Sequence, residues 1–181
     1  MSFVAPLPRS SAPVNHGILQ PFAIEEPIPV WFGRYLDDDE LSRTCRPLLK
    51  LRNAGGALTV VICRHADDAE LNLGALLDQV GNADRVVLTA AKASTAAQWP
   101  MQWGDLRAEA DKRRMKSVQI ETAVDRAVIG AMQSLQAGDT FVVLASADIE
   151  TDRVTGWLIQ GARWRGSLEA QDEDVFHHLA E

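Results

Sequence analysis

Three runs of mostly apolar, often β-branched residues constrain the fold of this 181-residue chain more than any other feature. They occupy residues 57–63 (ALTVVIC), 84–90 (DRVVLTA) and 140–145 (TFVVLA). Strands that are buried on both faces have this pattern, and such strands belong to parallel sheets covered by helices. We therefore expect an α/β fold with three layers, in which helices flank a mostly parallel, Rossmann-like sheet.

Helical patterns separate these runs. Between the first two, a capping-box pattern of Asp67 and Glu70 precedes leucines and a valine at helical spacing. A short strand–helix–strand unit of this kind favours a right-handed parallel crossover. Residues 122–136 form the clearest helical pattern, and Gly138 is expected to end that helix.

The other elements are less strongly marked. We expect a short strand at 30–35, a helix from the acidic run 37–40 to about residue 53 with Pro47 splitting it, and a short edge strand at 117–120. Residues 91–104 are expected to form a loop, and 105–116 an exposed charged helix. Asp148 is a candidate cap for a last helix that runs through Ile159.

Proline content predicts the domain organisation. Residues 1–29 hold six of the eight prolines and are predicted to form an extended arm or a flexible tail, whose use would be dimer contacts or domain packing. Residues 30–160 form the predicted α/β domain, and residues 161–181 a polar, acidic tail.

Composition excludes several classes of protein. The hydrophobic fraction of 46% supports a globular core, and the net charge of −7 argues against a nucleic-acid partner. No run approaches the roughly 20 apolar residues of a membrane span. Cys45 and Cys63 are expected to be reduced thiols in a cytoplasmic protein. Because neither GxxxxGK[ST] nor GxGxxG is present, we expect no nucleotide cofactor.

Candidate ligand-binding residues follow from the rule that ligands bind beyond the carboxyl ends of parallel strands. Arg64 and Lys92 would bind a carboxylate or phosphate, and Asp148 an amine, so the ligand would be anionic or zwitterionic and amino-acid-like. The candidate residues at the ends of the three runs or just after them are Arg64, His65, Asp67, Thr89, Lys92, Ser94, Thr95, Ser146 and Asp148. The alternative interpretation is that they are ordinary loop residues and helix caps.

Other chemistry-bearing residues leave alternatives open. His65 could act as a general acid or base, although no nucleophile can be assigned to it. Trp99 and Trp103 could bind a partner or cover a ligand, or they could fill a hydrophobic gap. His177 and His178 are expected to belong to a solvated tail, and no metal site is expected.

Three stretches resemble the C-terminal domain of Mur ligases, and among these cyanophycin synthetase most. They are ADRVVLTAAK (83–92), ETAVDRAVIGAMQSLQAGDTFVVLAS (121–146) and ADIETDRVTGWLI (147–159). The resemblance covers residues 58–158, just over half of the chain. Ser146, Ala147 and Asp148 stand where the family often has Gly-Lys-Gly, and residues 90–93 (AAKA) lie near the position of its Asp-Asn-Pro-Arg motif.

The resemblance implies a domain that closes over a ligase active site, without the central domain that supplies the phosphate loop and the metal ligands. We therefore expect no independent ATP-dependent ligation. The first hypothesis is a non-catalytic, stand-alone relative that binds a partner protein, such as a ligase or a second copy, or a small amino-acid-like ligand. The alternative is a small α/β enzyme that uses His65, Lys92 and Asp148 at the strand ends.

Overall fold

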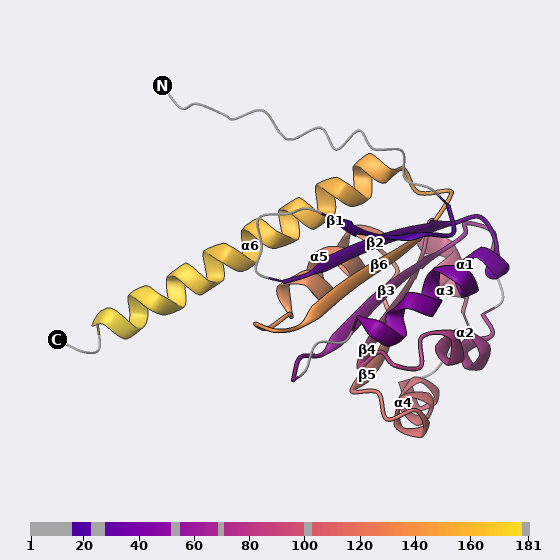
Figure 1. Ribbon diagram of the computed structural model, residues 1–181, viewed down its shortest axis with the longest axis horizontal. Coiled ribbons are helices and arrows are strands. Elements are labelled where there is room, and N and C mark those ends of the chain that lie inside the picture. The colour runs from indigo at the N-terminus through magenta and orange to yellow at the C-terminus, as the bar shows by residue number, and fades with distance from the viewer. Residues whose placement is uncertain (1–15, 23–27, 52–54, 69–70, 100–102, 179–181) are drawn as a thin grey trace.

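A six-stranded sheet with the order β1-β2-β6-β3-β4-β5 forms the centre of the computed structural model (Figure 1). The structure describes residues 16–22, 28–51, 55–68, 71–99 and 103–178. All neighbouring strands are parallel except β1, which pairs antiparallel with β2. The strands are β1 (Leu19–Phe22), β2 (Val30–Tyr35), β3 (Leu58–Arg64), β4 (Arg85–Ala90), β5 (Ser117–Ile120) and β6 (Thr140–Ser146).

The three apolar runs form strands, as predicted, and the fold places these strands side by side in the order β6-β3-β4. Every residue of β3 and β6 is buried, and so is all of β4 except Arg85. The short strands at 30–35 and 117–120 are also present, the second as the β5 edge. The predicted α/β fold class with a mostly parallel sheet is therefore confirmed.

Helices cover both faces of the sheet (Figure 1). One face carries α1, the 3₁₀ helix η1, α2, α3 and α4, and the other carries α5 and α6, so that each face has its own hydrophobic core. The helices are α1 (Asp38–Cys45), η1 (Arg46–Lys50), α2 (Leu73–Gln79), α3 (Ala93–Gln98), α4 (Trp103–Lys112), α5 (Val124–Gln133) and α6 (Thr151–His178). Among the described residues, none of the helices combines the length and the hydropathy that a membrane span requires.

Local signals set several helix boundaries where they were expected. Asp37 caps α1 by accepting a hydrogen bond from the Glu40 N–H at 2.8 Å. Pro47 lies in the first turn of η1, so the predicted helix after the acidic run is divided there into α1 and η1. Gly138, with φ +90, follows α5 and turns the chain into β6.

Two helix starts differ from the prediction. The side chain that caps α2 is Asn72, which accepts from the Ala75 N–H at 3.1 Å, and the helix begins several residues after Asp67. Asp148 does not cap α6, which begins at Thr151, because its carboxylate accepts a hydrogen bond from the loop after β3 instead. Asp67 and Asp148 are both suitable residue types for a helix cap, but Asp148 makes a tertiary hydrogen bond to the Ala66 N–H.

Two segments contain more helix than expected. The predicted loop at 91–104 contains α3, whose Thr95 and Ala96 are buried, and the start of α4. The last helix continues past Ile159 to His178, and its residues Ala162 and Arg165 are buried. These helices could not be predicted because their sequences are rich in small and charged residues. Too few of their residues are apolar to form a periodic pattern.

The predicted arm contains one strand of the sheet. Pro21 lies in β1, and a proline is tolerated there because β1 is the edge strand. Residues 1–15 and 23–27, which make up most of the predicted arm, lie outside the described residues, so the arm and the domain boundaries stay predictions.

Candidate functional site

The carboxyl ends of β6, β3 and β4 meet at one edge of the sheet. Strand β3 lies between the other two, and Cys63 is aligned with Ala145 of β6 and with Thr89 of β4. The residues that follow these strands are therefore brought together, as the sequence-based site required. We call this group the strand-end cluster; its members are Arg64, His65, Asp67, Lys92, Ser94, Thr95, Ser146 and Asp148.

Arg64 ends β3 and is already paired with two carboxylates. Its Nη1 lies 2.6 Å from Asp38 Oδ1, and its Nε lies 2.8 Å from Asp68 Oδ2. Burial by itself lowers the pKa of Arg64, but the hydrogen bond to Asp38 and the nearby negative charges outweigh it, so the pKa is raised. The guanidinium therefore holds the start of α1 to the loop after β3.

His65 and Asp148 form the second pair of the cluster. His65 Nδ1 lies 3.3 Å from Asp148 Oδ2, and the same oxygen accepts a hydrogen bond from the Ala66 N–H at 2.7 Å. The ring of Tyr35 meets the imidazole edge-on, with centroids 5.5 Å apart. His65 Nδ1 thus faces Asp148, and His65 Nε2 is buried with no hydrogen-bond partner among the described residues.

The Ala66 N–H lowers the pKa of Asp148 more than any other group does. Burial raises this pKa, whereas the hydrogen bond to His65 lowers it further. The net result is a carboxylate whose pKa lies below its ordinary value of 3.8. Asp148 is thus an ionised acceptor that ties the loop after β6 to the loop after β3.

The hydroxyl groups of the cluster bond to the protein's own backbone. Thr95 donates to the Ala66 carbonyl, and Ser146 Oγ donates to the Arg64 carbonyl at 3.3 Å. Trp99 is buried, and its Nε1 donates to the Asp68 carbonyl at 2.8 Å. Trp99 therefore fills a gap beside the loop instead of presenting a surface, which favours the second of its two sequence-based interpretations. The Trp103 side chain lies outside the described residues.

Lys92 and Ser94 lie at the exposed rim of the cluster. Lys92 Nζ is 3.6 Å from Asp67 Oδ1, and both side chains are mostly in solvent, so this pair contributes little. The two permanent cations, Arg64 and Lys92, face a larger number of acids. These acids are Asp38, Asp67, Asp68 and Asp148.

These ion pairs and hydrogen bonds therefore join the loop after β3 to the loop after β6 and to the start of α1. Arg64 is paired with Asp38 and Asp68, so a ligand carboxylate at Arg64 would compete with two acids that are already there, whereas Lys92 is mostly exposed and only weakly paired. The predicted binding of a small ligand at this edge stays a prediction. His177 and His178 lie at the end of α6, and their side chains are outside the described residues.

Sequence reasoning missed the partners that complete the cluster. Asp38 and Asp68 hold Arg64, and Tyr35 donates from its hydroxyl to the Cys63 carbonyl at 2.8 Å. By sequence alone, the acidic run at the start of α1 indicates only stabilisation of the helix dipole. The sequence signal that could have revealed Asp38 is that three consecutive aspartates exceed what capping one helix needs.

These features define a parallel α/β domain with an internally paired strand-end cluster. No family model and no curated protein matches the sequence. Among solved structures, a domain from a putative UDP-N-acetylmuramate:L-alanyl-gamma-D-glutamyl-medo-diaminopimelate ligase of Haemophilus ducreyi is similar, with a TM-score of 0.50 and 14% identity over 79% of this chain and 98% of that one. The fold is thus that of a Mur ligase domain.

Two longer Thermotoga maritima chains also match. UDP-N-acetylmuramate-alanine ligase MurC gives a TM-score of 0.49 with 14% identity over 81% of this chain, and MurF ligase gives 0.44 with 14% identity over 75%. This chain spans 29% of each of those proteins. At this level of identity the likeness concerns the fold alone, and the resemblance to cyanophycin synthetase stays a prediction.

Proposed function

We propose that this Mur-ligase-like domain works as a protein-binding module and not as a catalyst, and that the outer face of α6 is its binding surface. The observation that carries the proposal is Trp164, a large aromatic side chain that is 50% exposed on this helix. Tryptophan is enriched among the residues that dominate interface energies.

The packing of α6 supports this assignment. Val154, Leu158 and Ala162 are buried on the inner side of the helix, against the core beneath α5. The helix has 28 residues, which corresponds to about 42 Å, and Figure 1 shows it extending away from the sheet. A helix of this length exceeds what is needed to cover its own sheet.

The outer face is hollowed beside Trp164. A shallow hollow of about 340 Å³ is lined by Gly156, Ile159, Gln160, Arg163 and Trp164. These positions recur at helical spacing on one side of α6, with a glycine that leaves room for another chain. The hollow therefore combines an aromatic anchor, an aliphatic side chain and a cation in one strip.

The charge pattern of α6 favours a second copy of this chain as the partner. Arg153 and Arg163 are exposed in its first part, and Arg153 lies over the Trp157 ring at 5.3 Å. The later sequence carries Asp172, Glu173 and Asp174. In an antiparallel pair of α6 helices, the basic first half of each sequence would run alongside the acidic second half of the other, which satisfies the symmetry of a two-fold interface.

Sedimentation velocity over a range of protein concentrations tests the proposal. We expect a concentration-dependent dimer, and Trp164→Ala should raise its Kd by about thirtyfold, as for an interface hot spot of about 2 kcal/mol. Arg163→Glu should also weaken it, and more so at low salt. Leu36→Ala is the matched control, because Leu36 is 53% exposed and belongs to the turn between β2 and α1, not to α6.

A wild-type chain that stays monomeric at every concentration contradicts the proposal, and so does an equal effect of Trp164→Ala and Leu36→Ala. The alternative function, a small enzyme at the strand ends, has less support. His65 and Asp148 satisfy each other, and the remaining ring nitrogen of His65 is buried.

A further inference from the structure

The register of β3, β4 and β5 aligns three polar side chains in one row. Thr59 of β3 is paired with Arg85 of β4, and Arg85 is paired with Ser117 of β5. The next row on the same face pairs Val87 with Gln119. Because side chains alternate between the faces of a strand, these five residues all lie on the side of the sheet that carries α5.

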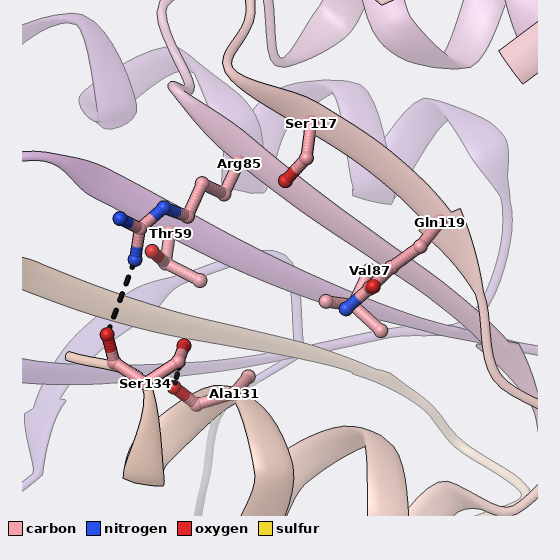
Figure 2. A pocket seen from close by; sticks show the side chains of 7 residues that line it. All are labelled: Thr59, Arg85, Val87, Ser117, Gln119, Ala131 and Ser134. Atoms are coloured by element: carbon pink, nitrogen blue, oxygen red, sulfur yellow. Dashed lines mark hydrogen bonds between the residues drawn. The ribbon is translucent and has the colours of Figure 1, made fainter. Parts of the chain in front are cut away.

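Helix α5 covers only part of this face. A pocket of about 310 Å³ remains beside it, lined by Thr59, Arg85, Val87, Ser117, Gln119, Ala131 and Ser134 (Figure 2). It opens near the amino ends of the strands, so it is separate from the strand-end cluster. Its volume is at the low end of the range for small-molecule sites, which is about 300–1,000 Å³.

Arg85 supplies the only charge among the lining residues. Its Nη1 donates to the Ser134 carbonyl at 3.2 Å, which orients the guanidinium across the mouth of the pocket (Figure 2). An arginine has five N–H donors, so this contact leaves others for an anion. A carboxylate is the group that a guanidinium binds best with two parallel hydrogen bonds.

Thr59 provides an independent sign of a ligand. The residue is 1% exposed, and within the part of the chain that the structure describes its Oγ1 has no hydrogen-bond partner. A buried hydroxyl without a partner is costly, and it lies in the row beside Arg85. Ser117 and the Gln119 side chain line the same pocket, so hydroxyl and amide groups surround the guanidinium.

The end of α5 limits the charge of the ligand. Ser134 is the C-cap of α5, and the C-terminal end of a helix carries a partial negative charge. A doubly charged phosphate is disfavoured beside this end of α5 more than a singly charged carboxylate is, because Arg85 supplies only one compensating charge. The geometry points to a binding site for a small organic monocarboxylate that carries hydroxyl groups, a function that is independent of protein binding through α6.

NMR titrations that follow the ¹⁵N–¹H chemical shifts of the backbone amides test this site. The three probes are L-lactate, D-glycerate and D-gluconate. We expect saturable shifts at Thr59, Arg85 and Ser117 with at least one of them, at concentrations up to about 50 mM, where a site with a Kd of about 1 mM is nearly full. The neutral amide of the same acid should cause no such shifts.

Variants separate binding from folding. Arg85→Gln should weaken the carboxylate by at least about tenfold, since it removes a charged hydrogen bond. Thr59→Val should weaken it by about fivefold while the melting temperature stays the same or rises, because the substitution removes an unsatisfied buried hydroxyl. Arg107→Gln on α4 is the matched control and should stay within about twofold of the wild type, because Arg107 is exposed far from the pocket.

The site is overturned if none of the three acids gives a saturable shift at these residues. It is also overturned if the amide binds as well as the acid, if inorganic phosphate binds more tightly than the carboxylate, or if Arg85→Gln and Arg107→Gln have equal effects.

Discussion

At the residue scale, Asp148 joins two loops that are distant in sequence. Its carboxylate accepts from the Ala66 N–H, 82 residues away, and lies beside His65. A carboxylate whose folded pKa lies below the unfolded value stabilises the protein above the unfolded value, and this contribution is lost as the pH falls through the folded value.

Asp148→Asn should therefore lower the free energy of unfolding at about pH 7 by about 1 kcal/mol, the loss expected for a partly exposed hydrogen bond to a charged group. The difference from the wild type should shrink as the pH falls through the lowered pKa of the wild-type carboxyl, where this group takes up a proton. Urea unfolding over a series of acidic pH values measures this. Asp111→Asn is the control, because its carboxylate is 73% exposed. A difference that does not change with pH contradicts the assignment.

The two cysteines offer a second test at this scale. Both are free and buried, and burial raises the pKa of Cys45 and of Cys63 to about 12. The reactive thiolate is therefore scarce near neutral pH. We expect iodoacetamide to label neither thiol in the native protein and both in urea, as measured by mass spectrometry. Labelling of the native protein at the rate of a free thiol would show that this part of the core opens.

At the element scale, the crossing of α5 and α6 depends on one small residue. A Cβ atom added at Gly161 of α6 would lie 2.9 Å from Met132 Cβ, and Met132 of α5 is fully buried. The two helices therefore approach more closely than a larger residue allows. This contact fixes where α6 leaves the sheet, and so where its outer face is presented.

Gly161→Ala should destabilise the protein by about 1–2 kcal/mol, as overpacking does. Gly130→Ala is the matched control, because the added Cβ on α5 meets nothing within 4 Å and alanine favours a helix by about 1 kcal/mol. Thermal and urea unfolding compare the two variants. If both substitutions stabilise the protein, the close approach of the helices is not required.

At the scale of the whole molecule, stability is expected to be highest at the centre of the sheet. Strands β6 and β3 are neighbours, each has a strand on both sides, and every one of their residues is buried. Strands β1 and β5 form the edges. Local opening costs least where few buried contacts are lost.

Amide hydrogen exchange should therefore be slowest in β3 and β6, and at least about tenfold faster at the bonded amides of β1 and β5, a difference of about 1.4 kcal/mol. Peptide-resolved mass spectrometry measures this gradient. Equal protection of β1 and β3 would contradict the expected gradient. Such a result would place strand β1 in the same cooperative unit as the centre of the sheet.

The sequence by itself determined the class of fold. The three apolar runs are local patterns typical of buried parallel strands, so the strands β3, β4 and β6 could be predicted, whereas their places beside one another in the sheet came from the fold. Helix α5 was predictable for the same reason. The lengths of α3 and α6 were not, because they depend on a few buried residues such as Ala96 and Ala162 that the chain alone does not mark.

The tertiary structure decided which polar residues are free to bind. The sequence predicts that Arg64 binds an anion, but in the fold Asp38 and Asp68 already lie against its guanidinium. Arg85 was overlooked, because it begins a strand instead of following one. Its alignment with Thr59 and Ser117 depends on strand order and register. Local residue patterns encode secondary structure, whereas a site depends on contacts between residues far apart in the chain.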